Sequence, residues 1–186
     1  MPDLLPVIAV LLIAVAVTGF LLYRRFRGGD RLEQLFRAIG HARIDALVIP
    51  NGDDGEIQID HLLLTSKGLL LLNIKEVTGS VFGSDKMSDW TVIAPERRYT
   101  FSNPQPGLYD RVAAVRQIVK DVPVEGRVLF LDGATFSKGV PAMVATIDEL
   151  RAEFGESDSA AAGRKIDAFK PFWETLKSAA ISGKWS

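Results

Sequence analysis

The chain has 186 residues, which suits one domain of ordinary size with an appended segment. It contains no cysteine, and this excludes disulfides, thiolate zinc sites and a cysteine nucleophile. The formal net charge is −1 at pH 7, so no global positive field attracts nucleic acid. This balance counts against tight, non-specific DNA binding, which rests on many phosphate contacts.

The first segment is an uncharged apolar stretch from Leu4 to Tyr23. About 20 such residues in a helix cross the ~30 Å hydrocarbon core of a bilayer. Arg24, Arg25 and Arg27 follow directly, and basic residues are retained on the cytoplasmic side of a membrane. A cleavable signal peptide would need basic residues before the apolar run and a small-residue cleavage site after it, and neither is present. Residues 1–27 are therefore predicted to be a single transmembrane anchor with a basic flank. The N-terminus lies outside, the soluble part is cytoplasmic, and a lone anchor of this kind indicates a bacterial protein.

After the basic flank, the chain alternates between helix and strand patterns. Residues 31–39 carry apolar side chains at i, i+3, i+4 and i+7, which predicts a helix. Further helices are predicted at about 108–121 and 147–154, and over the apolar positions from Ile166 to Ala180. Strands are predicted at 46–49, 56–65, 69–75, 80–82, 90–93, 99–101, 126–131 and 140–144. This order predicts an α/β fold, a mixed sheet flanked by helices.

The residues that can carry chemistry lie on two strands joined by the hairpin at residues 66–68. Asp60 and Gln58 are two apart on the first strand, and Asn73 and Lys75 are two apart on the second, so each pair shares a face of a regular strand. If the register brings both pairs to one face, two oxygen ligands and an ammonium group converge on one small cation. A hard ion such as Mg²⁺ prefers oxygen ligands. The lysine can then orient the attacking water or offset charge on a phosphate.

Regular alternation also assigns a place to the residues around Asp60. Ile57, Ile59 and His61 are expected to face one way, and Gln58 and Asp60 the other. His61 is therefore expected to be a packed or hydrogen-bonded core histidine rather than a catalytic one. Trp90 is expected to be a core or interface aromatic residue.

Residues 30 to about 144 resemble the nuclease-related domain (NERD) family, a branch of the restriction-endonuclease-like PD-(D/E)xK superfamily. The resemblance rests on pieces that follow one another along the chain: Gln58-Ile59-Asp60-His61, the Gly68 hairpin, Ile74-Lys75, Gly79-Ser80-Val81-Phe82-Gly83, Trp90-Thr91 and Phe101-Ser102-Asn103-Pro104. It implies an α-β-β-β-α-β nuclease core with Asp60 and Lys75 in the metal and catalytic positions. Residues 28–155 are then the NERD-like domain. Residues 156–186 are expected to form a mobile linker and a C-terminal amphipathic helix that packs on the domain.

The chain departs from the family pattern at three places. The family usually has Glu two residues before the lysine and Asn directly after it, whereas this chain has Asn73 and Glu76. Glu76 is an odd number of residues from Asn73, so on a regular strand it faces the other way unless a bulge intervenes. The glutamine expected shortly after the Asn-Pro pair is replaced by Gly107, with Gln105 nearby, and the usual Gly-Glu before the first helix is Gly29-Asp30.

Two functions follow, and the sequence leaves both open. A purely structural role is a third possibility, but it does not explain the presence of Asp60 and Lys75. In the first, the protein is a membrane-tethered, Mg²⁺-dependent nuclease that hydrolyses DNA or RNA at the cytoplasmic face. Asp60, Asn73 and the Ile74 carbonyl would hold the metal and Lys75 would assist the water, with Gln58, Glu76 and Asn103 as supporting residues. In the second, the domain is a catalytically inactive binding or scaffold module at the lipid bilayer, and it engages nucleic acid or a protein partner. The missing charge at Asn73 weakens the free energy of metal binding by roughly several kcal/mol, and this leaves the enzymatic activity undecided. No organic cofactor is expected.

Overall fold

The computed structural model describes residues 31–52, 55–155 and 160–181. The chain divides into two compact units, residues 1–34 and residues 35–186. In the first unit the described residues, 31–34, are helical, and the predicted anchor lies outside the described residues. Among the helices that are described, none is both long and apolar enough to cross a bilayer. Residues 156–159 of the predicted linker are also outside the description.

The larger sheet of the second unit is mixed, as predicted, and has the strand order β1-β2-β3-β7-β9. Its strands are β1 (Ala42–Asn51), β2 (Gly55–Thr65), β3 (Gly68–Lys75), β7 (Val124–Phe130) and β9 (Val144–Ala145). The first three strands pair antiparallel, and the β3–β7 and β7–β9 pairs are parallel. Residues 68–72 of β3 are all buried, because this strand has a helix layer on each face.

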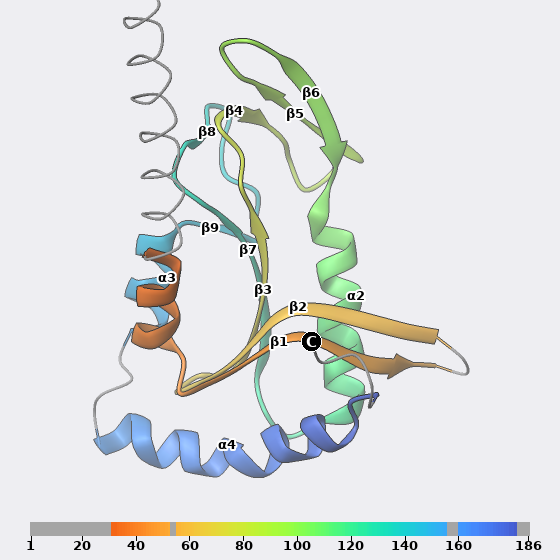
Figure 1. The fold of residues 1–186 in the computed structure, drawn as a ribbon, viewed down its shortest axis with the longest axis vertical. Coiled ribbons are helices and arrows are strands. Elements are labelled where there is room, and N and C mark those ends of the chain that lie inside the picture. Colours follow the sequence, from red (N-terminus) through yellow and green to blue (C-terminus); the bar gives the residue numbers. More distant parts are fainter. Residues whose placement is uncertain (1–30, 53–54, 156–159, 182–186) are drawn as a thin grey trace, which may run out of the picture. The chain divides into compact units, whose positions relative to one another are not determined.

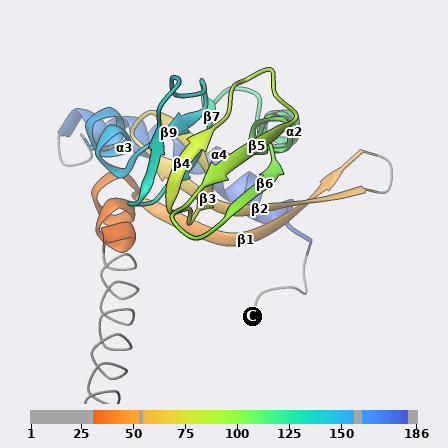
Figure 2. The same ribbon diagram turned by 90° about the horizontal axis from the view of Figure 1, so that it is seen from above.

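Helices cover both faces of this sheet (Figures 1 and 2). Residues 35–39 of the first helix and α3 (Ile147–Phe154) lie on one face, and α2 (Pro104–Ile118) lies on the other. The α2 face carries the main apolar cluster, in which Leu62 and Leu71 of the sheet meet Leu108 and Val112. The last helix, α4 (Ala160–Ser178), adds Trp173 to the same cluster.

Four short strands form a second sheet in the order β6-β5-β4-β8, which the sequence patterns did not separate from the first. They are β4 (Gly79–Phe82), β5 (Asp89–Ile93), β6 (Arg98–Ser102) and β8 (Ala134–Phe136). Trp90 of β5 is fully buried, which confirms the prediction of a core residue. Its ring packs against Phe101, Phe136 and Phe130, and Phe130 ends strand β7 of the larger sheet. The aromatic cluster therefore joins the two sheets.

The hairpin of β1 and β2 is bent, and the bend corrects the regular alternation predicted for β2. Ile59 belongs to the same buried cluster as Leu62, whereas His61 contacts the Phe36 ring on the other face. Ile59 and His61 therefore do not share a face. The physical reason is Ala46, which has φ 54° and sits where the β1–β2 register passes from Asp45–His61 to Leu47–Ile59. By that register Ala46 lies opposite Asp60, so the bend falls beside the candidate site.

We expect Ala46→Gly to raise the free energy of unfolding by about 0.5–1 kcal/mol, because glycine adopts positive φ without the steric cost that alanine meets there. Chemical denaturation of the 186-residue chain in mild detergent, followed by circular dichroism, measures the change. The matched control is Ala113→Gly on the exposed side of α2, which is expected to lower stability by about 1 kcal/mol. A loss at position 46 equal to that at position 113 would contradict the left-handed conformation.

Candidate functional site

Asp60 on β2 and Asn73 on β3 meet through their side chains. Asn73 Nδ2 donates a hydrogen bond to Asp60 Oδ2 over 2.6 Å in a partly buried setting. The register pairs His61 with Leu72, so Asp60 and Asn73 are the next two residues along and face each other. Asn73 lies beside Val128 of β7, whose side chain is in the cluster under α2. Of the three residues that the sequence proposed as metal ligands, the structure thus brings the side chains of Asp60 and Asn73 together on the α2 face of the sheet.

The contact lies where the two strands separate, and we call this place the fork. The β2–β3 ladder ends at His61–Leu72; β3 continues beside β7, while β2 continues beside β1 into the projecting hairpin (Figure 1). The Lys75 carbonyl accepts from Leu131 on the β7 side. Because carbonyl directions alternate along a strand, the Ile74 carbonyl points the other way, toward the fork. That carbonyl lies beyond the end of the ladder, so it has no ladder partner on β2.

The side-chain oxygen of Asn73 bears on whether the fork could hold a cation. Asn73 Oδ1 is buried and has no hydrogen-bond partner within the part of the chain that the structure describes. An unpaired buried carbonyl costs about 1–3 kcal/mol, and it can be satisfied by a cation. Together with Asp60 and the Ile74 carbonyl it makes an oxygen-only ligand set, the kind that Mg²⁺ prefers. Across residues 31–52, 55–155 and 160–181, no cluster of three or more His, Cys, Asp or Glu residues is present, and the fork itself has one carboxylate, that of Asp60.

Lys75 completes the fork on the β3 side. It is two residues beyond Asn73 on the same strand face, and it is half-buried beside Phe130 of the aromatic cluster. Its ammonium group forms no ion pair with any described residue. A cation without a carboxylate partner is available to an anionic ligand.

The three supporting candidates have different positions. Gln58 is exposed on the β2 arm of the fork. Glu76 is exposed and follows directly after β3 ends. Asn103 is the N-cap of α2, where its Oδ1 accepts from the Gln105 backbone and its Nδ2 donates to the Met87 carbonyl over 2.9 Å. The Asn103 amide is thus used to hold the β4–β5 loop against the start of α2.

His61 has the structural role that the sequence predicted. Its Nδ1 lies 2.7 Å from Asp45 Oδ1, and its ring centroid is 5.4 Å from that of Phe36. These partners lie on the face opposite Asp60. His61 therefore links β2 to β1 and to the first helix, and it takes no part in the fork.

Sequence patterns missed Arg111 of α2, which reaches the β2 arm of the fork. Its Nε donates to the Gln58 carbonyl over 2.7 Å, and its Nη1 donates to the Gly107 carbonyl over 2.8 Å. The available signal was the spacing of four residues between Gly107 and Arg111, which puts them one helical turn apart.

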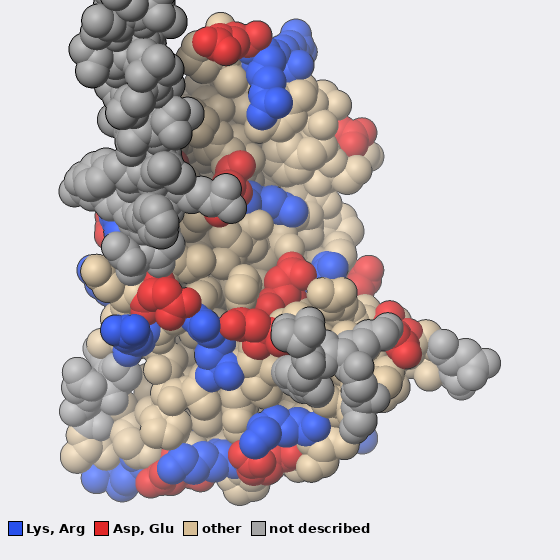
Figure 3. Space-filling model, viewed as in Figure 1, with Lys and Arg blue, Asp and Glu red and all other residues tan. Residues whose placement is uncertain are grey.

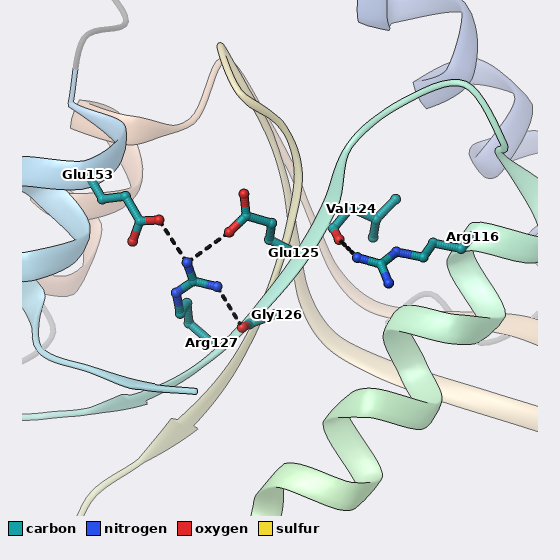
Figure 4. Close-up of polar contacts among 6 residues, drawn as sticks. All are labelled: Arg116, Val124, Glu125, Gly126, Arg127 and Glu153. Atoms are coloured by element: carbon teal, nitrogen blue, oxygen red, sulfur yellow. Dashed lines mark hydrogen bonds and ion pairs between the residues drawn. The ribbon is translucent and has the colours of Figure 1, made fainter. Parts of the chain in front are cut away.

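Charge elsewhere on the surface is mixed in sign. Figure 3 shows acidic and basic side chains alternating along α4, and the pKa of Asp167 there is lowered by its hydrogen bond from Lys170. Figure 4 shows a second mixed group, in which Arg127 Nη2 lies 2.8 Å from Glu125 and 2.7 Å from Glu153. Arg127 pairs with Leu72 of β3, so this group joins β7 to α3 on the face opposite the fork.

A protein-family model matches a large part of the chain. Residues 24–131 match the nuclease-related domain, NERD, over more than half of the 186 residues. The chain belongs to this family, which is part of the restriction-endonuclease-like superfamily. This confirms the resemblance seen in the sequence motifs.

One curated protein shares a shorter stretch of sequence with the chain. The chain is 27% identical over 63 residues to an uncharacterized protein of Bacillus anthracis. The matched residues make up 34% of this chain and 30% of that protein. The chain thus spans less than a third of the length of that relative. No solved structure matches the chain significantly.

Proposed function

We propose that the protein is a metal-dependent nuclease whose catalytic centre is the fork between β2 and β3. One observation carries the proposal: Asn73 Oδ1 is buried and unpaired beside the Asp60 carboxylate in a domain of the nuclease-related family. Domains of this superfamily are typically metal-dependent. Lys75 adds a cation on the same face.

Each residue of the fork has a proposed role in catalysis. Asp60, Asn73 Oδ1 and the Ile74 carbonyl would hold a divalent ion such as Mg²⁺, which supplies Lewis acidity toward a phosphoryl oxygen. Lys75 would offset the charge that develops on the phosphate and orient the attacking water. Since Lys75 is half-buried beside Phe130, its charge is screened less than that of a fully exposed lysine. The substrate class is a phosphodiester of DNA or RNA.

The second candidate is an inactive binding module, and it is favoured by a specific contact. Asn73 donates its amide hydrogen to Asp60, so the carboxylate already has a partner and the fork is stable without a second acid. The fold would then present Lys75 and neighbouring cations to nucleic acid or to a protein without cleaving it.

Cleavage assays with site variants separate these two candidates. The 186-residue chain in mild detergent is incubated with plasmid, linear duplex and single-stranded substrates in Mg²⁺ or Mn²⁺. Asp60→Ala and Lys75→Ala are each expected to lower the rate at least about a hundredfold, because each removes a group that acts on the phosphate or its metal. Asp89→Ala and Lys120→Ala, exposed residues outside the fork, serve as matched controls.

Degradation that survives both Asp60→Ala and Lys75→Ala would exclude the fork as the catalytic centre. An intact chain that binds nucleic acid and cleaves none of the substrates would support the binding module instead.

The proposal includes attachment to a membrane through residues 1–27. It rests on the uncharged run from Leu4 to Tyr23 and on the three arginines that follow it. We expect the chain to sediment with membranes and to resist extraction by carbonate. Protease added outside intact cells would leave the domain uncut if that domain is cytoplasmic, and recovery of the chain in the soluble fraction would contradict the anchor.

A further inference from the structure

Arg111 uses only part of its hydrogen-bonding capacity inside the protein. A guanidinium group has five N–H donors, and two of these go to the carbonyls of Gln58 and Gly107. Within residues 31–52, 55–155 and 160–181 no carboxylate pairs with Arg111. The side chain is half-buried. A full positive charge is thus held in place by two neutral carbonyls, with donors left over.

The carbonyl of Gln58 meets Arg111 in the opening left by β3. In an antiparallel pair, opposed residues either exchange both hydrogen bonds or point both groups outward. Val48 lies opposite Gln58, and its carbonyl accepts from Ile181 at the outer edge of β1. The pair is therefore of the outward type, and the Gln58 carbonyl points to the side from which β3 has departed. Arg111 fills that place.

This position puts the guanidinium close to the proposed catalytic residues. Gln58 and Asp60 are two residues apart on β2, about 7 Å along the strand. Lys75 lies on the other arm of the fork. Arg111 of α2, bonded to the β2 arm, and Lys75 at the end of the β3 arm therefore lie near Asp60 from the two sides of the fork, and the three groups carry a net positive charge.

Gly107 leaves room for the Arg111 guanidinium beside the helix backbone. A Cβ atom at position 107 would lie 3.1 Å from Arg111 Nη1, which is a tighter approach than ordinary van der Waals contact. Without a side chain at 107, the guanidinium lies back along α2 against the helix backbone. Gly107, where the chain departs from the family pattern, therefore supplies both a carbonyl acceptor and space for Arg111.

We propose that Arg111 is a phosphate-binding residue of the fork and that its free N–H groups contact a backbone phosphate of the bound nucleic acid. The inference rests on the proposed function in that nucleic acid is the ligand. Arginine suits this role because its planar donors match two phosphate oxygens at once. The Gln58 and Gly107 carbonyls already fix the Arg111 guanidinium before a phosphate binds. Little side-chain entropy is therefore lost on binding.

Equilibrium binding without cleavage tests the inference. The 186-residue chain in EDTA is titrated against fluorescein-labelled duplex and single-stranded oligonucleotides at several salt concentrations, and anisotropy gives the association constant. Arg111→Ala is expected to weaken binding about tenfold at low salt. It is also expected to reduce the slope of log K against log salt by about 0.9 for duplex and about 0.7 for single strands, which corresponds to one lost phosphate contact. Arg111→Lys is expected to keep the slope and to recover part of the affinity.

The matched control is Arg116→Ala on the same helix. Arg116 is exposed and donates to the Val124 carbonyl over 2.6 Å, so it has the same kind of side chain-to-strand bond at a place outside the fork (Figure 4). Its removal is expected to leave both the affinity and the salt slope unchanged. A purely structural role for Arg111 would lower the melting temperature and leave the salt slope intact, and that result would overturn the inference. If Arg111→Ala fails to fold, an Arg111→Lys variant with a reduced slope would overturn it equally.

Binding and cleavage results together distinguish a failure of the Arg111 inference from a failure of the proposed nuclease activity. Arg111-dependent binding without any cleavage would reject hydrolysis and keep the phosphate contact. Cleavage that depends on Asp60 while binding ignores Arg111 would do the reverse. A wild-type chain that binds neither oligonucleotide would reject the phosphate contact.

Discussion

Asn73→Asp is expected to make the stability of the protein depend on divalent cations. Asn73 Nδ2 lies 2.6 Å from Asp60 Oδ2, and aspartate would put a second carboxylate oxygen at this contact without changing the size of the side chain. Two carboxylates about 4 Å apart repel each other by about 4 kcal/mol at an effective dielectric constant of 20. Because the site is only partly buried, we expect the free energy of unfolding at pH 7 to fall by about 2–4 kcal/mol in EDTA.

Mg²⁺ or Mn²⁺ should recover most of that loss, since a bound cation replaces the repulsion by two attractions. Lowering the pH should also recover it. Repulsion raises the pKa of one carboxyl in the folded variant above its unfolded value, so the variant gains stability relative to wild type as the pH falls through that raised pKa. Thermal unfolding of both proteins with and without millimolar Mg²⁺ measures the effect. Cleavage assays on the same samples show whether the second acid increases activity.

Asn73→Ala is the control for this experiment. It removes the hydrogen bond to Asp60 without adding charge, so its stability should not respond strongly to Mg²⁺. If the stability of Asn73→Asp were indifferent to both Mg²⁺ and pH, the two side chains would not be in contact, and the fork would not be a cation site.

Gly83→Ala is expected to lower the free energy of unfolding by about 3 kcal/mol, the largest steric effect that we predict. A Cβ atom at position 83 would lie 2.5 Å from Trp90 Cδ2 and 2.6 Å from Trp90 Cγ. Trp90 cannot move away, because it is fully buried against Phe101, Phe130 and Phe136. Chemical denaturation monitored by tryptophan fluorescence measures the change.

The matched control is Gly163→Ala in α4, where a new Cβ would meet nothing within 4 Å. It is expected to stabilise the protein by about 0.5–1 kcal/mol through helix propensity. The comparison also bears on function, since Phe130 is the β7 neighbour of Lys75. A displaced Trp90 should therefore lower any activity at the fork, whereas Gly163→Ala should not. Equal stability of the two variants would contradict the packing of Gly83 on Trp90.

Local patterns were sufficient for most of the elements. The alternation and the apolar run on either side of the Gly68 hairpin predicted β2 and β3, and they have the antiparallel pairing that such a hairpin requires. Helix spacing predicted α3 at residues 147–154 and the end of the first helix at residue 39, and both are confirmed. The start of α2 was predicted at 108, and the structure begins it at Pro104, because the Asn103 cap and a proline in the first turn extend it. Strand β8 was not predicted, since its three residues carry no pattern of their own.

Asp60, Asn73 and Lys75 became candidates through their residue types and their spacing along two adjacent strands, and both of these are local properties of the sequence. The contact of Asp60 with Asn73, the unpaired Asn73 oxygen and the arrival of Arg111 depend on the bend at Ala46 and on where β3 leaves β2. The sequence by itself therefore determined the family and most of the strands, and it supplied candidate residues for the site. Only the tertiary structure decided their geometry, because residues 53 positions apart such as Gln58 and Arg111 are brought together by long-range packing, which no local pattern encodes.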